Sequence, residues 1–137
     1  KNFNFYSNFN YQNGEEEMED GSLSPSRHAA PWFGRSGIVF KYKDARLEFY
    51  TEYSGEVSFE NLNVGEQGKA HLYASDENGN PYSPGWYTLN FKLLYPMGDI
   101  LQLSAGIENL TDQRFRTYSS GIASAGRNFI FALRMQF

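Results

Sequence analysis

Six segments of the sequence alternate between large apolar and polar side chains, and this period of two limits the possible folds more than any other feature. Successive side chains of a β-strand point to opposite faces of the sheet, so the period predicts strands with two unlike faces. The first segment places Phe3, Phe5 and Phe9 on one face and Asn4 and Asn8 on the other. The six segments are residues 3–11, 37–43, 45–53, 86–95, 100–108 and 128–137.

Short and long connections alternate between these segments. Tight turns are predicted at residues 43–44 and 96–99, the second being "PMGD", with Pro and Gly in turn positions. The long connections are rich in Gly, Pro, Asn and Ser and are interpreted as loops at about 12–31, 55–85 and 109–127. Short turns on one edge of a sheet and long loops on the other are typical of transmembrane β-barrels.

Strand length and aromatic placement favour the same class of fold. Strands of about 9–11 residues span a bilayer, and the second segment is short enough that its strand is expected to begin nearer Trp32. Aromatic girdles mark both interfaces of such barrels. Tyr42 and Tyr95 would lie at the short-turn edge, and Tyr11 and Tyr53 at the loop edge. A soluble antiparallel sandwich also alternates, but it scatters its long loops over both edges.

Six strands are too few to close a membrane barrel, since the smallest bacterial barrels have eight. Open strand edges are not tolerated in lipid, because their backbone groups have no water to bond. The sequence therefore predicts an all-β chain of six antiparallel transmembrane strands that forms part of a larger barrel.

Composition argues against several other functions. The chain has 137 residues and no cysteine, so disulfides and thiolate metal sites are excluded. A net charge of −4 argues against a nucleic-acid partner. His28 and His71 lie in different loops, and "DENGN" at 76–80 is interpreted as an Asn-Gly turn, so no metal or cofactor is expected. No catalytic constellation is recognisable, and an enzyme is not predicted.

The second half of the chain resembles the C-terminal end of a TonB-dependent outer-membrane receptor. The resemblance is carried by "SPGWYTLNFKLLYP" at 83–96, "LQLSAGIENLTDQRFRTYSSGI" at 101–122 and "AGRNFIFALRMQF" at 125–137. Two other stretches look like receptors from Bacteroidetes-type bacteria: "APWFGRSGIVFKY" at 30–42 and "GKAHLYASDENGNPYSPGW" at 68–86.

This resemblance implies a barrel of about 22 strands in the bacterial outer membrane, of which residues 1–137 would form the C-terminal segment. The family implies import of a scarce nutrient, such as a metal chelate, a cofactor, or a glycan or peptide fragment. The implied partners are the plug domain and remaining strands of the same receptor, TonB acting through the N-terminal part, lipid and lipopolysaccharide, and the assembly machinery. The plug would lie outside this chain, the short turns in the periplasm and the long loops outside the cell. The alternatives are a barrel without TonB, such as a porin or adhesion platform, and a fragment held as a client of the assembly machinery.

Barrels of this kind resemble one another in ending on an aromatic residue with apolar residues at alternate positions before it. That pattern, which would serve as the assembly signal by strand addition, is matched by Phe129, Phe131, Leu133, Met135 and Phe137.

Two sets of residues are candidates for contact with other groups. In the family, substrate is contacted by extracellular loops, and the candidates here are Tyr73, Tyr82, Trp86, Arg114, Arg116 and Tyr118. The alternative is that these side chains only pack the loops together. Charged residues on the polar faces of the strands are expected to line the lumen and contact the plug, and they are Arg46, Glu48, Glu52 and Lys92.

Overall fold

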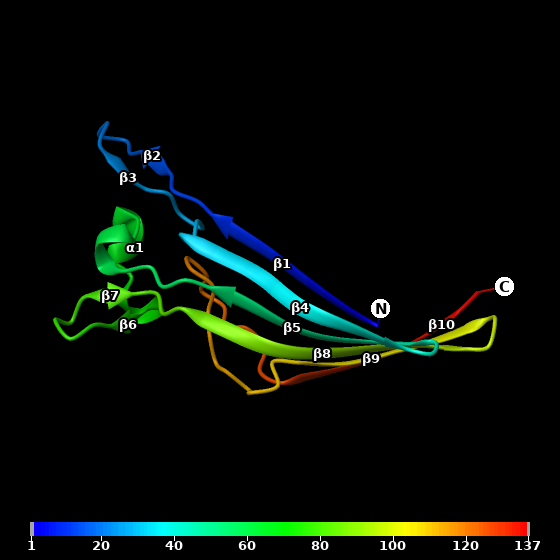
Figure 1. Cartoon of the computed structure of the whole chain (residues 1–137). Helices are drawn as coiled ribbons and strands as arrows, with labels where there is room; N and C mark the ends of the chain where they lie inside the picture. The colour runs from blue at the N-terminus through cyan, green and yellow to red at the C-terminus, as the bar shows by residue number, and fades with distance from the viewer. Residues whose placement is uncertain (1, 137) are drawn as a thin grey trace.

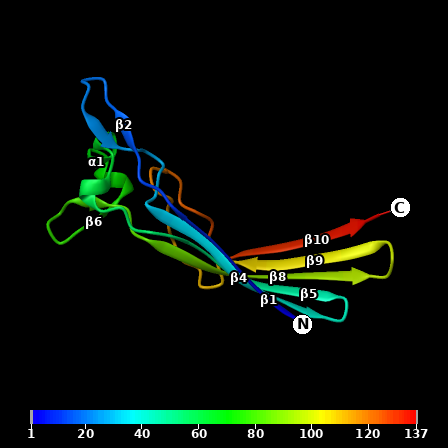
Figure 2. The ribbon, with the colours of Figure 1, turned by 45° about the horizontal axis from the view of Figure 1, so that its top comes forward.

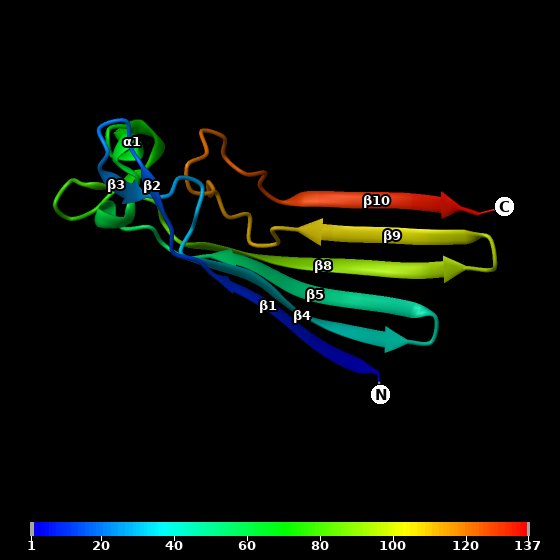
Figure 3. The same ribbon diagram turned by 90° about the horizontal axis from the view of Figure 1, so that it is seen from above.

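The computed structural model describes residues 2–136 and contains one six-stranded sheet in which every neighbouring pair is antiparallel. The strands lie side by side in the order β1-β4-β5-β8-β9-β10 (Figures 1 and 3). Their bounds are β1 Phe3–Tyr11, β4 Trp32–Tyr42, β5 Ala45–Ser54, β8 Trp86–Met97, β9 Leu101–Glu108 and β10 Asn128–Met135. The six predicted strands are thus confirmed, and the second begins at Trp32 as expected.

One face of the sheet is apolar and exposed, because the register brings the apolar positions of all six strands into common rows. The central row runs from Phe5 in β1 through Phe49 in β5 to Phe129 in β10, with paired residues in every strand between them. The rings of Phe49 and Phe91 lie 4.7 Å apart, centroid to centroid. Four of these six side chains are exposed, among them Phe5 at 69% and Phe129 at 71%, and Phe91 and Ile107 are half-buried. We call this face the apolar belt.

Aromatic side chains border the apolar belt at both ends. At the loop end, the ring of Trp32 lies 6.5 Å from that of Phe9 and 6.1 Å from that of Tyr53. At the short-turn end, Tyr42 closes β4, and Tyr95 pairs with Leu103. The four tyrosines predicted for the two edges therefore lie on the strands at those edges.

The two short turns each contain a residue with positive φ, Lys43 in the first and Gly98 in the second. Lys43 and Asp44 connect β4 to β5, and Lys43 adopts a φ of 51°, in the left-handed region that side chains with a Cβ rarely adopt. The second turn was predicted at about 96–99 and lies at 98–100, because β8 continues to Met97. Pro96 pairs with Gln102, beyond the point where β5 pairs with β8, so its missing N–H costs no bond to that neighbour.

The three long connections gather at the opposite end of the sheet and contain short elements of their own (Figures 1 and 2). We call residues 12–31, 55–85 and 109–127 together the loop cap. Its elements are β2 Glu15–Glu17, β3 Leu23–Pro25, the 3-10 helices Phe59–Asn61 and Ala70–Leu72, α1 Val64–Gln67, β6 Ala74–Ser75 and β7 Pro81–Tyr82. Among residues 2–136, no helix has the length and apolarity needed to cross a membrane.

The small hydrophobic core lies in the loop cap. Val57 and Leu62 from the second loop and Tyr118 from the third are buried together, and Phe59 and Tyr73 pack against them. The second and third loops thus share one core although residues 86–108, which form β8, a turn and β9, separate them in the sequence.

Candidate functional site

A network of charged and hydroxyl groups occupies the polar face of the sheet. Glu48 in β5 accepts a hydrogen bond of 2.6 Å from the Tyr6 hydroxyl and forms ion pairs with Arg35 at 3.2 Å and Arg46 at 3.6 Å. Tyr6 lies over Gly37, where an added Cβ would come within 2.6 Å of its hydroxyl oxygen. Gly37 is therefore needed for the tyrosine to reach the carboxylate.

The structure brings most of the predicted lumen residues together. Arg46 and Glu48 form an ion pair. Glu52 is linked to this pair through Arg35, because the Arg35 guanidinium lies 3.5 Å from the Glu52 carboxylate. Lys92 faces Glu48 in the strand register, but no ion pair joins them. Arg35 was not predicted, because it lies before residue 37, where the alternation was first counted.

A second network joins the three loops at one side chain. Asn63 is fully buried, and its amide donates hydrogen bonds to the Glu16 carboxylate at 2.7 Å and to the Pro25 carbonyl at 2.8 Å. Its backbone N–H donates to the Tyr118 hydroxyl at 3.0 Å. Its side-chain oxygen caps α1 by accepting from the Gly65 N–H. One residue of the second loop thus holds the first and the third.

Glu66 is a second buried polar group of the loop cap. Its carboxylate accepts hydrogen bonds from Lys69 at 2.8 Å and from the Tyr73 hydroxyl at 2.6 Å. Burial alone would raise the pKa of the Glu66 carboxyl, but these bonds outweigh it and hold the pKa below its ordinary value. Burial, together with the hydrogen bond to Glu66, raises the pKa of the Tyr73 hydroxyl.

The third loop is fixed to the sheet at its base by buried asparagines. The Asn109 N–H donates to the side-chain oxygen of Asn90 in β8 at 2.9 Å, and the Asn109 amide donates to the Gln113 carbonyl at 2.8 Å. Asn109 adopts a φ of 50°, a conformation that asparagine tolerates better than most residues. Asp112 accepts a bond of 2.7 Å from the Arg127 N–H at the other end of the loop. The segment after Arg114 therefore starts from a fixed position.

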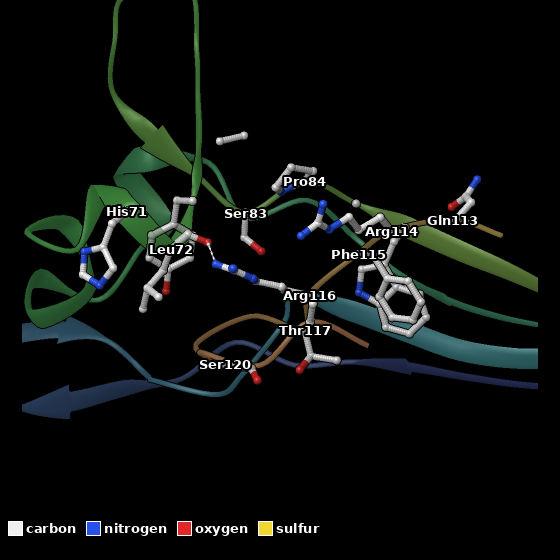
Figure 4. Close-up of a pocket in the computed structure, with 15 residues that line it drawn as sticks. His71, Leu72, Ser83, Pro84, Gln113, Arg114, Phe115, Arg116, Thr117 and Ser120 are labelled. Carbon is white, nitrogen blue, oxygen red and sulfur yellow. Dashed lines mark hydrogen bonds between the residues drawn. The ribbon is translucent and has the colours of Figure 1, made fainter. Parts of the chain in front are cut away.

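A pocket of about 320 Å³ lies between the second and third loops (Figure 4). The rings of Trp86 and Phe115 stack at 4.1 Å and form one side of it. Arg116 extends across it and donates a hydrogen bond of 3.3 Å to the Leu72 carbonyl. We call this cavity the loop pocket.

Four of the six predicted substrate-contacting residues line the loop pocket: Tyr73, Trp86, Arg114 and Arg116. The other two lie elsewhere. Tyr82 borders a separate hollow beside Glu56, and Tyr118 is buried in the core of the loop cap, where it holds Asn63. Phe115 was not predicted, although its place between two arginines in "RFR" was a signal for it.

The loop pocket is positive and contains no acid among its described lining residues. Arg114 and Arg116 supply two guanidinium groups, and neither forms an ion pair within residues 2–136. In that same range no group of three or more His, Asp or Glu side chains is arranged to hold a metal ion.

The residues predicted for the assembly signal lie on β10, at one edge of the sheet. Phe129, Phe131, Leu133 and Met135 face the same side as the apolar belt and are all exposed, while β10 pairs with β9 alone. Phe137 lies outside the described residues.

Known structures with the same arrangement are receptors and transporters. The copper transporter OprC matches with a TM-score of 0.70 and 16% identity, over 99% of this chain and 21% of its own. The ferric enterobactin receptor PfeA from Pseudomonas aeruginosa matches with a TM-score of 0.68 and 17% identity, over 99% of this chain and 20% of its own. The ferric citrate transporter FecA in its unliganded form matches with a TM-score of 0.67 and 18% identity, over 98% of this chain and 20% of its own.

These likenesses show the fold, which is that of a part of the barrel of TonB-dependent receptors. The chain spans about a fifth of the length of each of these proteins. The matched proteins are transport receptors and not enzymes. No protein-family model and no curated protein sequence matches the chain.

Proposed function

We propose that this chain is the C-terminal barrel segment of a TonB-dependent transporter that imports a scarce nutrient across the bacterial outer membrane. The observation that carries the proposal is the match of 98–99% of the chain to the barrels of such receptors and transporters. The resemblance at 83–137 supports the C-terminal position. The resemblance at 30–42 and 68–86 supports an origin in Bacteroidetes-type bacteria.

The apolar belt supports a position in the membrane. A water-soluble protein rarely exposes a continuous apolar surface of more than a few hundred Å². Here the belt extends over all six strands and is bordered by aromatic residues at both ends. In our proposal the belt contacts lipid and lipopolysaccharide, the short turns face the periplasm and the loop cap faces the cell exterior.

The two edge strands support a larger barrel of about 22 strands. β1 and β10 each have one neighbour among the described strands, and an unpaired edge cannot persist in lipid. The remaining strands of the receptor would complete the pairing, and the plug would face the network around Glu48. β10 would be read by the assembly machinery through its exposed backbone and its apolar positions, with Phe137 at the end.

The cargo site is assigned to the loop pocket, with Tyr73, Trp86, Arg114 and Arg116 as contacting residues. Tyr82 and Tyr118 are also retained as candidates, although the burial of Tyr118 and its bond to Asn63 favour a role in holding the loops together.

The first test is the intact mass of the denatured polypeptide that carries this segment, isolated from outer membranes. We expect a mass several times the 15.7 kDa of this chain, with upstream peptides of a plug and a TonB box. A large barrel without plug or TonB box would favour a porin or an adhesion platform. A mass near 15.7 kDa would replace the transporter with a split barrel or an assembly client.

A further inference from the structure

Two arginines without an acidic partner among residues 2–136 share the loop pocket, whereas the cations of the two polar networks are paired. Arg27 is paired with Glu16, Arg35 with Glu48 and Lys69 with Glu66, at distances of 2.8–3.2 Å. Arg114 and Arg116 lie at one cavity in a chain of net charge −4, and no carboxylate within residues 2–136 pairs with either. Both guanidinium groups are thus left to attract an anion from outside the described chain.

The loop pocket holds the Arg116 guanidinium by a hydrogen bond and anchors the backbone from which Arg114 extends. Asn109 and Asp112 fix the base of the third loop, and the bond from Arg116 to the Leu72 carbonyl ties the loop to its neighbour. Figure 4 shows both arginine side chains extending from the third loop toward the second. A guanidinium offers a planar fork of donors that matches the oxygens of a carboxylate or phosphate.

The remaining lining specifies what the anion carries besides its charge. The stacked rings of Trp86 and Phe115 present an apolar side, and Thr117 and Ser120, which lie below Arg116 in Figure 4, add hydroxyl groups to the lining. A volume of about 320 Å³ is at the small end of the range for ligand sites. The lining therefore suits a small molecule with oxyanion groups and an apolar part.

We propose that the loop pocket binds a small oxyanionic ligand, whose carboxylate or phosphate groups contact Arg114 and Arg116 and whose apolar part rests on Trp86 and Phe115. This inference rests on the proposed function, since it names the class of cargo that the pocket selects. It separates an anionic cargo from a neutral glycan, which carries no charge to balance two unpaired guanidinium groups.

The test is calorimetric titration of the full-length receptor in detergent with three probes: citrate, inorganic phosphate and the neutral sugar maltotriose. We expect citrate or phosphate to bind, more weakly as salt is raised, and maltotriose not to bind. The stronger of the two anions identifies the oxyanion group. Binding of maltotriose alone, or of no probe, would overturn the proposal.

Variants assign the binding to the arginines. Arg114 is exposed and forms no hydrogen bond with another described residue, so Arg114→Gln tests charge without loss of a structural contact. We expect it to weaken anion binding about tenfold, the loss of one charged hydrogen bond. Arg116→Lys keeps the charge but loses the fork, and a smaller loss is expected. The matched control Lys41→Gln/Lys43→Gln removes two exposed charges at the short-turn end and should leave the affinity unchanged.

Unchanged anion affinity in Arg114→Gln, or an equal loss in the lysine control, would refute the assignment. The resistance of the folded barrel to SDS before heating shows that each variant is folded. Calorimetry needs no TonB, so failure of this inference is separable from failure of the proposed function, which the intact mass decides.

Discussion

The sheet and the loop cap place opposite kinds of side chain at their surfaces. In the sheet the large apolar residues point outward, and Phe49 in its centre is 59% exposed, while charged groups meet on the other face. In the loop cap Leu62 is fully buried and Val57 almost so. The burial of apolar side chains thus differs between the two regions, and this difference supports our proposal that hydrocarbon lies beside the sheet and water around the cap.

Polar groups show the same contrast. On the sheet the ion pairs of Arg35 and Arg46 remain partly open to solvent, and each adds little to stability. In the cap Asn63 and Glu66 are buried with their hydrogen-bonding groups satisfied, and leaving such a group without its partner is costly. The cap should therefore be more sensitive than the polar face of the sheet to the loss of a single polar side chain.

The largest effect is expected where a charge is placed on the apolar belt. Phe5→Arg should cost about 2–4 kcal/mol and reduce the amount of folded protein in the outer membrane, because in our proposal the charge would face hydrocarbon. The adjacent Asn4→Arg is the control, since Asn4 is exposed on the opposite face. Heat-modified mobility on gels measures the folded fraction. Equal losses for both variants would contradict the assignment of faces.

The next effect concerns the junction of the loops. Asn63→Ala removes the cap of α1 and the bonds to Glu16 and Pro25, and should destabilise the loop cap by about 3 kcal/mol while leaving the sheet folded. Limited proteolysis of the loops, followed by mass spectrometry, measures this. Asn78→Ala, at an exposed position of the same loop, should have no effect. If cleavage rates do not differ between the two variants, Asn63 is not the junction.

Acid should loosen the loop cap through Glu66. The pKa of the Glu66 carboxyl is lowered on folding. The carboxylate therefore stabilises the loop cap fully at pH values above its ordinary pKa of 4.5, and this stabilisation is lost as pH falls through the folded pKa. Protease resistance of the cap should therefore stay constant from pH 7 to about 4.5 and decline below.

Glu66→Gln should lower resistance at neutral pH by about 1–2 kcal/mol and flatten the acid decline. Exposed Glu60 provides the control Glu60→Gln, which should retain the wild-type profile. If protease resistance of Glu66→Gln declined in acid as it does in the wild type, other carboxyl groups would be responsible for that decline.

The smallest effect lies in the short turn between β4 and β5. Lys43→Gly should stabilise the receptor by about 0.5 kcal/mol, because glycine adopts a φ of 51° without the Cβ clash. Asp44 is not among the residues with positive φ, so Asp44→Gly should destabilise slightly. Unfolding in urea, followed by tryptophan fluorescence, compares them. A loss of stability in Lys43→Gly would show that this strain is absent.

The six strands of the sheet could be predicted because the alternation of neighbouring residues in each strand indicates its two faces. The residues Phe3 to Tyr11 alternate except at Tyr6 and Ser7, and β1 has the bounds that the pattern predicted. The turn at Pro96 was misplaced, because a proline reads as a turn residue unless it is known that no neighbouring strand needs its N–H. The grouping of Tyr73 with Trp86 and Arg116 was foreseen only as a set of candidates, without the pocket that joins them.

By itself the sequence determined the strands, their two faces and the division into short turns and long loops, because a period of two is a property of neighbouring residues. Only the tertiary structure decided that Asn63 joins three loops, that Tyr118 is a core residue, and that Arg114 and Arg116 lie at one cavity without an acidic partner among residues 2–136. These contacts link residues 38 to 55 positions apart, and no local pattern encodes which distant partner a buried polar group will find.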